Sequence, residues 1–522
     1  MKTTFLTATL LATTIMAAPA RAQSDGDACA ALAEIGLPDI EVSTAAAQDA
    51  GTLPPDPMSA MTGGSPTPVE AGAHCLVEGK IEDREGADGN RYGIRFQLRM
   101  PDDWNGRFLF QGGGGTDGFI APAIGAVPSL GSTATPALGR GYAVVSMDGG
   151  HDALDLGFTA DQQARLDLAY AAIGKVTDTA KALIGAYYAE DPERSYFMGC
   201  SNGGREAMMA AERFPLEFDG VVAGNPGFHL SRAAVGSVWD YETFGAIAPE
   251  GRLYDALTQE DLDTVADEVL AQCDALDGVE DGIVAAYGQC DFDAEALRGR
   301  IGDDKLDALI AVMEGARDVD GNPVYAGWPW DPGMAAPGWR AWKLGTEDEP
   351  AMHQTLSVPS TGAVFMTPPQ EVPADPDFGA LARAVADVGG YFDADDTFLT
   401  TFAARGGKMV IFQGAADPIF SAVDIARWYE EAEADTAADT DFAQLFVVPG
   451  MNHCGGGPAF EDFDPLTLLE EWQETGEAPQ SMPAAAPTMP GRAMPICAYP
   501  ATARHTGGDV NAASSFTCTL PE

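Results

Sequence analysis

The sequence predicts an α/β protein, with a mostly parallel sheet covered by helices and a large inserted domain. Short apolar runs typical of buried strands alternate with stretches of helical spacing in the first half of the chain. This alternation stops near residue 230, and the strand pattern returns near residue 408 of the 522 residues. We therefore expect a core formed by residues 23–229 and 395–522, interrupted by an insertion at residues 230–394.

The expected elements follow in chain order. Strands are predicted at residues 91–100, 108–111, 142–147, 194–198, 221–224, 408–412 and 444–448. Helical spacing predicts helices at residues 166–188, 205–214, 262–275 and 422–430. Segments 23–80 and 476–495 are rich in Pro and small residues, and they are expected to be irregular.

The first residues have the pattern of a secretory signal peptide. Lys2 supplies a positive charge, residues 5–18 are apolar, and Ala20-Arg21-Ala22 is a small-x-small cleavage site. We expect cleavage after Ala22 and a secreted or periplasmic protein. No later segment is apolar enough to span a membrane, and a formal charge of −50 excludes nucleic acids and anionic membranes as general partners.

A serine stands in a sharp turn between a predicted strand and a predicted helix. The segment Gly199-Cys200-Ser201-Asn202-Gly203-Gly204 follows the strand at 194–198 and precedes the helix at 205–214. A G-x-S-x-G sequence in this position is the nucleophile elbow of α/β-hydrolases. The alternative interpretation is an ordinary Gly-rich turn. As an elbow, the segment predicts Ser201 as the nucleophile.

A serine nucleophile needs a histidine base and a carboxylate that orients it, and in these hydrolases both follow the serine. His453 lies in a loop directly after the last predicted strand, and Asp417 directly follows the strand at 408–412. Asp424 is a rival, but it falls inside a predicted helix. We therefore predict a Ser201, His453 and Asp417 triad, against the alternative that His453 is a surface-loop residue.

Backbone N–H groups must also stabilise the negative charge that develops on the substrate oxygen. The residue after the nucleophile, Asn202, is expected to supply one of them. The glycine run Gly112–Gly115 follows an early strand, as the HGGG-type loop of esterases does. Gly113 is the predicted second donor, with its neighbour Gly114 as the alternative; a merely flexible loop is the competing interpretation.

Eight cysteines in an exported chain predict four disulfides. Proximity in sequence suggests Cys29–Cys75, Cys273–Cys290 and Cys497–Cys518, which leaves Cys200 with Cys454. Cys200 precedes the predicted nucleophile and Cys454 follows the predicted base. If the serine and the histidine touch, these two cysteines are close, so triad geometry and cysteine parity predict the same bond.

The insertion contains a compact acidic loop at residues 273–283. It carries Asp274, Asp277 and Asp281 among glycines, and hard oxygen ligands without His or thiolate suit calcium. The spacing is not that of an EF-hand. An acidic turn without a metal is an equally good interpretation of composition alone, and the bracketing disulfide Cys273–Cys290 favours a structural metal site.

Together these motifs resemble the tannase and feruloyl esterase family. The Cys-Ser-x-Gly-Gly elbow, the later Asp and the His-Cys pair match at Cys200, Ser201, Asp417, His453 and Cys454. The resemblance implies an α/β-hydrolase core with a large lid domain at residues 230–394, and a structural Ca²⁺ in that lid. Calcium ligands would then be the carboxylates of Asp274, Asp277 and Asp281 and the carbonyls of Val279 and Ile283.

The predicted function is that of a secreted serine esterase acting on small aromatic (phenolic) carboxylic esters, such as feruloyl or galloyl esters. One alternative in the same family is a mono(2-hydroxyethyl) terephthalate hydrolase, an enzyme whose lid uses an arginine to hold the free carboxylate of its substrate. Between Arg340 and Arg383 this chain has no arginine, only Lys343. Another is a non-catalytic, calcium-dependent binding protein. Acyl group, alcohol and oligomeric state stay open. Aromatic candidates for substrate contact, or equally for the lid core, are Trp328, Trp330, Trp339, Trp342 and Phe365.

Overall fold

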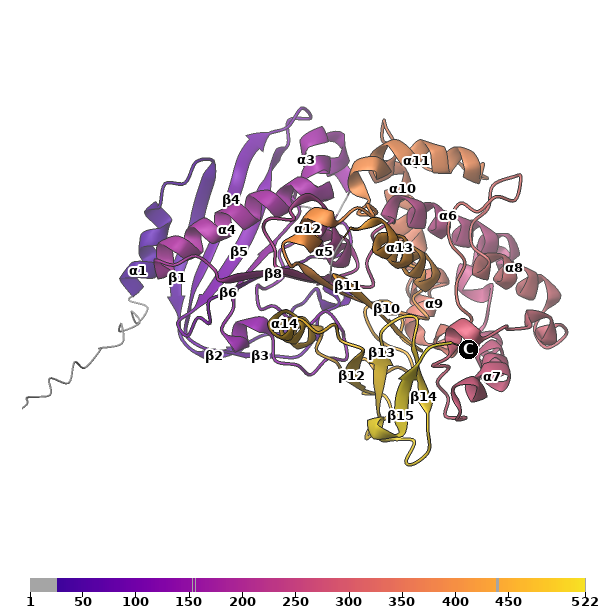
Figure 1. Ribbon diagram of the computed structural model, residues 1–522. Coiled ribbons are helices and arrows are strands. Elements are labelled where there is room, and N and C mark those ends of the chain that lie inside the picture. Colours follow the sequence, from indigo (N-terminus) through magenta and orange to yellow (C-terminus); the bar gives the residue numbers. More distant parts are fainter. Residues whose placement is uncertain (1–25, 153, 155, 438–440, 522) are drawn as a thin grey trace, which may run out of the picture.

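The computed structural model describes residues 26–152, 154, 156–437 and 441–521. The predicted signal peptide, residues 1–22, lies outside them. A nine-stranded sheet crosses the molecule (Figure 1). Its strands, in spatial order, are β1 (Ile40–Gln48), β4 (His74–Glu85), β5 (Arg91–Pro101), β7 (Ala143–Met147), β6 (Arg107–Gln111), β8 (Arg194–Cys200), β9 (Gly220–Gly224), β10 (Lys408–Gly414) and β11 (Ala443–Val448).

The sheet has an antiparallel part and a parallel part. β1, β4, β5 and β7 pair antiparallel, whereas β7, β6, β8, β9, β10 and β11 pair parallel. The parallel strands are buried on both faces, which explains their continuous apolar runs in the sequence. The carboxyl ends of these parallel strands share one edge of the sheet, where the predicted catalytic residues follow.

Helices cover both faces of this sheet. The apolar side chains of one face pack against α1 (Gly26–Ala31), α4 (Ala172–Tyr188), α5 (Asn202–Arg213), α12 (Thr400–Ala404) and α13 (Ala422–Asp435). The other face packs against α14 (Pro465–Thr475) and two hairpins, β12 (Ser481–Ala485) with β13 (Ala493–Cys497) and β14 (Thr502–His505) with β15 (Phe516–Thr519). The fold is therefore the layered α/β architecture that the sequence predicts.

Two segments expected to be irregular form strands instead. Residues 23–80 contain β1 and most of β4, together with the small pair β2 (Gly51–Leu53) and β3 (Val69–Ala71) and the short helix α2 (Ser59–Thr62). Residues 476–495 contain β12 and the start of β13. β1 reads IEVSTAAAQ, and its alanines give little β propensity or alternation. Pairing with β4, not a strong local signal, makes it a strand.

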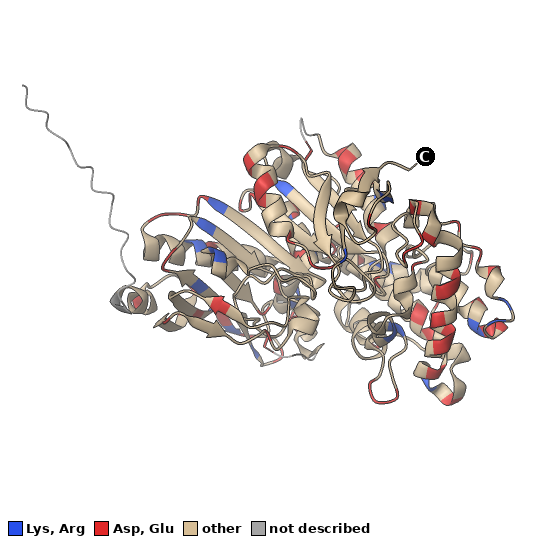
Figure 2. Ribbon diagram, turned by 90° about the horizontal axis from the view of Figure 1, so that it is seen from below, with Lys and Arg blue, Asp and Glu red and all other residues tan. Residues whose placement is uncertain are grey.

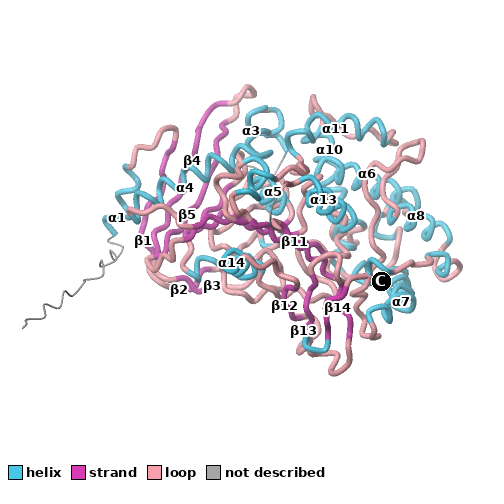
Figure 3. Tube along the Cα trace, viewed as in Figure 1, coloured by secondary structure: helices cyan, strands magenta, loops and turns pink. Residues whose placement is uncertain are grey.

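Between β9 and β10 the chain forms a helical insertion (residues 230–394; Figure 3). Its two ends lie together, because the Ala394 N–H donates to the Phe228 carbonyl at 2.7 Å. Asp393 accepts hydrogen bonds from the Ser231 backbone and hydroxyl. The helices are α6 (Leu230–Ile247), α7 (Gln259–Cys273), α8 (Asp303–Met313), α9 (Pro337–Lys343), α10 (Val358–Phe365) and α11 (Phe378–Phe392); α3 (Gln162–Leu166) lies in the core.

Four disulfides join the pairs expected from the sequence: Cys29–Cys75, Cys200–Cys454, Cys273–Cys290 and Cys497–Cys518. Such bonds persist in oxidising compartments. None of the described helices is long and apolar enough to cross a membrane. Acidic residues are spread over the molecule and gather on outer helices of the insertion, among them α7 (Figure 2).

Candidate active site

Ser201 stands at the carboxyl end of β8, immediately before α5. Its backbone has φ 61° and ψ −123°, a strained conformation that lifts the side chain out of the strand-to-helix turn. The turn is possible because glycines let the backbones approach: a Cβ on Gly203 would lie 2.7 Å from the Gly113 carbonyl oxygen. Any side chain there would push the nucleophile turn away from the glycine run.

His453 and Asp417 lie in the loops after β11 and β10. The imidazole Nδ1 of His453 is hydrogen-bonded to Asp417 Oδ2 at 2.9 Å. Asp417 also accepts hydrogen bonds from Asn225 Nδ2 at 2.6 Å and from the Ile419 N–H at 2.8 Å. Burial alone would favour the neutral acid, but His453 and these donors hold the pKa of Asp417 below its ordinary value. The carboxylate can therefore orient the imidazole.

The other imidazole nitrogen is available. His453 Nε2 is buried and has no hydrogen-bond partner among the described residues. The Cys200–Cys454 disulfide, with a Cα–Cα distance of 6.1 Å, joins the residue before Ser201 to the residue after His453. Trp342 and Phe420 both contact the His453 ring at 5.3 Å between centroids, and both line one pocket with Ser201. The His453 ring therefore lies against two residues that line the pocket of Ser201.

Asp424, the rival carboxylate, lies in α13 and points elsewhere. Its Oδ2 is 3.3 Å from Nδ1 of His229, a different histidine.

The glycine run does not present the N–H groups that the sequence suggests. The Gly113 N–H donates to Glu206 Oε2 at 3.0 Å, and the Gly114 N–H donates to Asp117 Oδ1 at 3.0 Å. An N–H group that donates to a carboxylate cannot also donate to an oxyanion, so neither Gly113 nor its alternative Gly114 fits the predicted role. Gly115 and Thr116 line the pocket beside Ser201 and Asn202 instead. The sequence shows the run but not which of its peptides turns toward the pocket.

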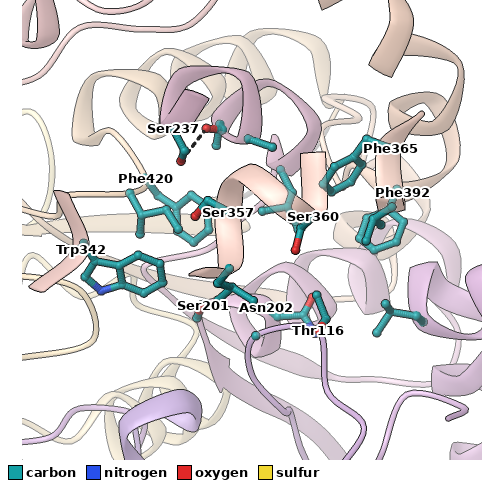
Figure 4. Close-up of a pocket in the computed structure, with 18 residues that line it drawn as sticks. Thr116, Ser201, Asn202, Ser237, Trp342, Ser357, Ser360, Phe365, Phe392 and Phe420 are labelled. Atoms are coloured by element: carbon teal, nitrogen blue, oxygen red, sulfur yellow. Dashed lines mark hydrogen bonds between the residues drawn. The ribbon is translucent and has the colours of Figure 1, made fainter. Parts of the chain in front are cut away.

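The pocket is walled mainly by apolar side chains of the helical insertion (Figure 4). Of the aromatic candidates, Trp342 and Phe365 line it, whereas Trp339 is 3% exposed in the insertion core and Trp328 and Trp330 pack against that core. Spacing gave no signal for Phe392 and Phe420, which also line it. None of its described lining residues is charged; they include Leu168, Leu230, Ala233, Ala234, Ser237, Leu356, Ser357, Ser360, Val364 and Ile419.

Lys343, the one cation of the insertion that the sequence offered for a free carboxylate, is not in the pocket. It is fully buried and ion-paired with Asp240. Its ammonium group lies 4.4 Å from the centroid of the Trp328 ring. Both contacts fix it inside the insertion, so it cannot reach a substrate without leaving its counter-ion buried and unpaired.

The predicted calcium loop is compact and acidic. Asp274 accepts the N–H groups of Asp281 and Gly282, and Asp277 and Asp281 accept those of Val279 and Ile283. Burial, with the charges of Asp281 and Asp274, raises the pKa of Asp277 to about 7.

A bound cation would stabilise the ionised form of these buried carboxyl groups, but Arg492 already forms an ion pair with Asp281. In the described parts of the chain, the triplet whose ligand atoms lie within 4.8 Å of one another is a different one: His229, Asp393 and Asp395.

The chain is similar to known esterases and to a terephthalate hydrolase. A model of the tannase and feruloyl esterase family matches residues 75–519. The chain is 38% identical to a mono(2-hydroxyethyl) terephthalate hydrolase of Piscinibacter sakaiensis over 86% of its length and 85% of that protein. It is 27% identical to a probable feruloyl esterase of Arthroderma benhamiae over 81% of each chain.

Among solved structures, feruloyl esterase B from Aspergillus oryzae superimposes with a TM-score of 0.78 at 22% identity, covering 95% of this chain and all of the other. That likeness shows a shared fold. With the family match spanning most of the chain, it follows that the protein belongs to the tannase and feruloyl esterase family.

Proposed function

We propose that this protein is a serine esterase that hydrolyses uncharged aromatic carboxylic esters, such as feruloyl or galloyl esters. The observation that carries the proposal is a pocket with an apolar, aromatic wall that contains the strained Ser201, while two of its lining residues, Trp342 and Phe420, contact the Asp417-bonded ring of His453. Relatives named as feruloyl esterases and as a terephthalate ester hydrolase support an ester as substrate.

In the proposed reaction Ser201 Oγ attacks the ester carbonyl carbon while His453 Nε2 takes the hydroxyl proton. Asp417 holds the imidazole through Nδ1 and stabilises its protonated form. The tetrahedral intermediate collapses when His453 gives that proton to the leaving alkoxide, which departs as the alcohol. Water then attacks the acyl-enzyme with His453 again as base, releasing the acid and restoring Ser201.

The negative charge on the carbonyl oxygen would be held by backbone N–H groups at the pocket floor. Asn202 follows Ser201 and begins α5, so its N–H is one of the unpaired donors of a helix N-terminus. Gly115 and Thr116 line the pocket from the glycine run and are the proposed second source. This replaces Gly113, whose N–H is bound to Glu206.

The lining favours a neutral acyl group over a terephthalate monoester. A free carboxylate inside this pocket would lose its hydration without gaining a cation, which costs several kcal/mol. Lys343 is occupied by Asp240. Phe365 and Phe392 can pack against an aromatic ring, and the hydroxyls of Ser357 and Ser360 face the same cavity (Figure 4).

The test compares the parent and Ser201→Ala on methyl ferulate, methyl gallate, 4-nitrophenyl acetate and monomethyl terephthalate. We expect the parent to prefer the uncharged aromatic esters, and the variant to lose about 10⁴-fold or more in kcat. A fluorophosphonate should label Ser201 of the parent. Equal rates in parent and variant would refute the mechanism; a folded parent that neither reacts nor labels would favour a non-catalytic binding protein.

We also propose export through the signal at residues 1–22, and a structural Ca²⁺ held by Asp274, Asp277 and Asp281 with the carbonyls of Val279 and Ile283. The three carboxylates gathered in one compact loop support the metal, and burial, with the charges of Asp281 and Asp274, raises the pKa of Asp277 there. Four disulfides support an oxidising compartment. Chelation should lower the thermal midpoint, calcium should restore it, and Asp277→Asn should remove that response.

A further inference from the structure

A buried polar cluster lies directly beneath the glycine run and uses none of the triad residues. Its members are Asp117, Asn202, Arg205 and Glu206, each at most 3% exposed. Asn202 Nδ2 donates to Asp117 Oδ1 at 2.9 Å and to Glu206 Oε1 at 3.3 Å, and Arg205 Nε donates to Asn202 Oδ1 at 2.8 Å. The cluster therefore connects the first turn of α5 to the loop after β6.

This cluster holds two consecutive peptides of the glycine run. Glu206 binds the Gly113 N–H and Asp117 binds the Gly114 N–H, each at 3.0 Å. Both acceptors are buried carboxyl groups, and hydrogen bonds to such groups are strong in a medium of low dielectric constant. They fix where the run passes over α5, and hence where Gly115 and Thr116 lie at the pocket.

The cluster contains two carboxyl groups, Asp117 and Glu206, and one guanidinium, Arg205. The buried charges cancel only if one of the two carboxyl groups stays protonated. The Arg205 guanidinium donates hydrogen bonds to the Asn202 side chain and to the backbone carbonyls of Leu168, Ala169 and Phe392. It donates none to the carboxyl groups of Asp117 and Glu206. Two ionised carboxylates would face one guanidinium that neither binds directly.

Burial, then the charge of Glu206, raises the pKa of Asp117 well above its ordinary value, and burial likewise raises the pKa of Glu206. After these two carboxyl groups, the acidic residues that interact electrostatically with Arg205 are Asp393 and Glu212.

We propose that Asp117 and Glu206 are positioning residues that share one proton and, in that state, hold the glycine run in the geometry that stabilises the oxyanion. The inference rests on the proposed function and deepens it. When the shared proton is lost at alkaline pH, the two carboxylates, which accept from the same Asn202 Nδ2 and from consecutive peptides of the run, repel each other. The run then shifts, and the rate of the chemical step falls with little change in substrate binding.

Two variants of Asp117 distinguish a role for its proton from a purely structural role of its side chain. Asp117→Asn keeps the acceptor for Gly114 and replaces the acid O–H by an amide N–H, so it copies the protonated state at every pH. Asp117→Ala removes the acceptor and the donor. Glu212→Gln is the matched control, because Glu212 lies at the far end of α5 and burial raises its pKa to about 7.

The assay is 4-nitrophenyl acetate hydrolysis and fluorophosphonate labelling between about pH 5 and 10. Losing one oxyanion donor costs about 10²- to 10³-fold in kcat, so Asp117→Ala should fall by up to that amount with KM within about threefold. Asp117→Asn should keep kcat within about threefold and lack the parent's alkaline decline. Glu212→Gln should follow the parent at every pH.

Identical alkaline profiles for the parent and Asp117→Asn would overturn the inference, as would a rise in KM without loss of kcat in Asp117→Ala. If Asp117→Ala fails to fold by circular dichroism, the profile of Asp117→Asn alone decides. Ser201→Ala separates the two levels. If it keeps full activity, the proposed function fails; if it is inactive while Asp117→Asn retains the alkaline decline, only the positioning role fails.

Discussion

The sheet core and the helical insertion contribute different kinds of side chain to the same pocket. The core supplies Ser201, Asn202 and Thr116, and behind them His453 and Asp417 are held by hydrogen bonds and a disulfide. The insertion supplies most of the aliphatic and aromatic wall, to which the core adds Leu168, Ile419 and Phe420. The Ser237 hydroxyl of the insertion donates to the Ala233 carbonyl of its own helix. Under the proposed function, the core would carry out the reaction and the insertion would select the acyl group.

The largest effect is expected from the core carboxylate. Asp417→Asn keeps the shape but cannot hold the required imidazole tautomer, so kcat should fall by about 10⁴-fold at neutral pH with little change in KM. Asp424→Asn is the matched control, because this carboxylate contacts His229. Steady-state kinetics on one ester measure both. A larger loss in Asp424→Asn would mean that the triad carboxylate has been misassigned.

The disulfide beside the triad should be worth more than the one at the carboxyl terminus. Cys200–Cys454 closes a separation of 254 residues, and Cys497–Cys518 closes 21. Chain entropy gives about 5 kcal/mol for the first and about 3 kcal/mol for the second. Replacing both cysteines of each pair by serine, with denaturant unfolding and kcat as readouts, tests this.

Only the first double variant should also lose kcat, because only that bond joins the nucleophile turn to the histidine loop. Equal losses of kcat in both would show that general destabilisation, not the position of the bond, is responsible.

Asp331 links the two regions and should make stability depend on pH. It is buried between the insertion and the histidine loop and accepts the N–H groups of Gly333 and Gly450. Burial raises its pKa to about 6. The folded state therefore holds its proton longer than the unfolded chain, whose Asp pKa is about 3.9, and this group's contribution falls by about 3 kcal/mol as pH rises from about 4 to 6.

Asp331→Asn cannot lose that proton. The thermal midpoint of the variant, relative to the parent, should shift in the variant's favour between pH 4 and 7 and then stay level. A difference that does not change with pH would show that the Asp331 carboxyl titrates normally. An Asn at this position accepts only one of the two N–H groups, so the slope with pH is the readout and not the absolute midpoint.

Local patterns were sufficient where function depends on chain order. The elbow, the Asp and the His each follow a strongly apolar parallel strand, so the residues of the candidate triad could be named from the sequence. Patterns failed where tertiary contacts decide. The alanine-rich β1 becomes a strand only by pairing with β4, and Gly113 looks like a donor until Glu206, 93 residues later, is seen to hold its N–H. The pocket role of Phe392 and Phe420 likewise depends on how distant segments fold together.

The smallest expected effect comes from the insertion. Phe365 lines the pocket and contacts Phe392 edge-on at 5.1 Å between centroids. Phe365→Leu keeps most of the apolar volume but removes an aromatic partner worth about 1 kcal/mol, or about fivefold in KM for methyl ferulate. 4-Nitrophenyl acetate, whose acyl group is too small to reach this ring, should show no change. Phe292→Leu is the control, because Phe292 packs against Trp330 in the insertion core.

If Phe365→Leu lowers kcat for both esters by the same factor, the insertion takes part in the chemistry and the division between the two regions fails. If it raises KM for the aromatic ester alone, that division holds at the level of a single ring: the core carries out the same reaction on any acyl group, and the insertion decides how long an aromatic one stays. Because only the ratio of the two substrates matters, a modest loss of stability in the variant cancels from the comparison.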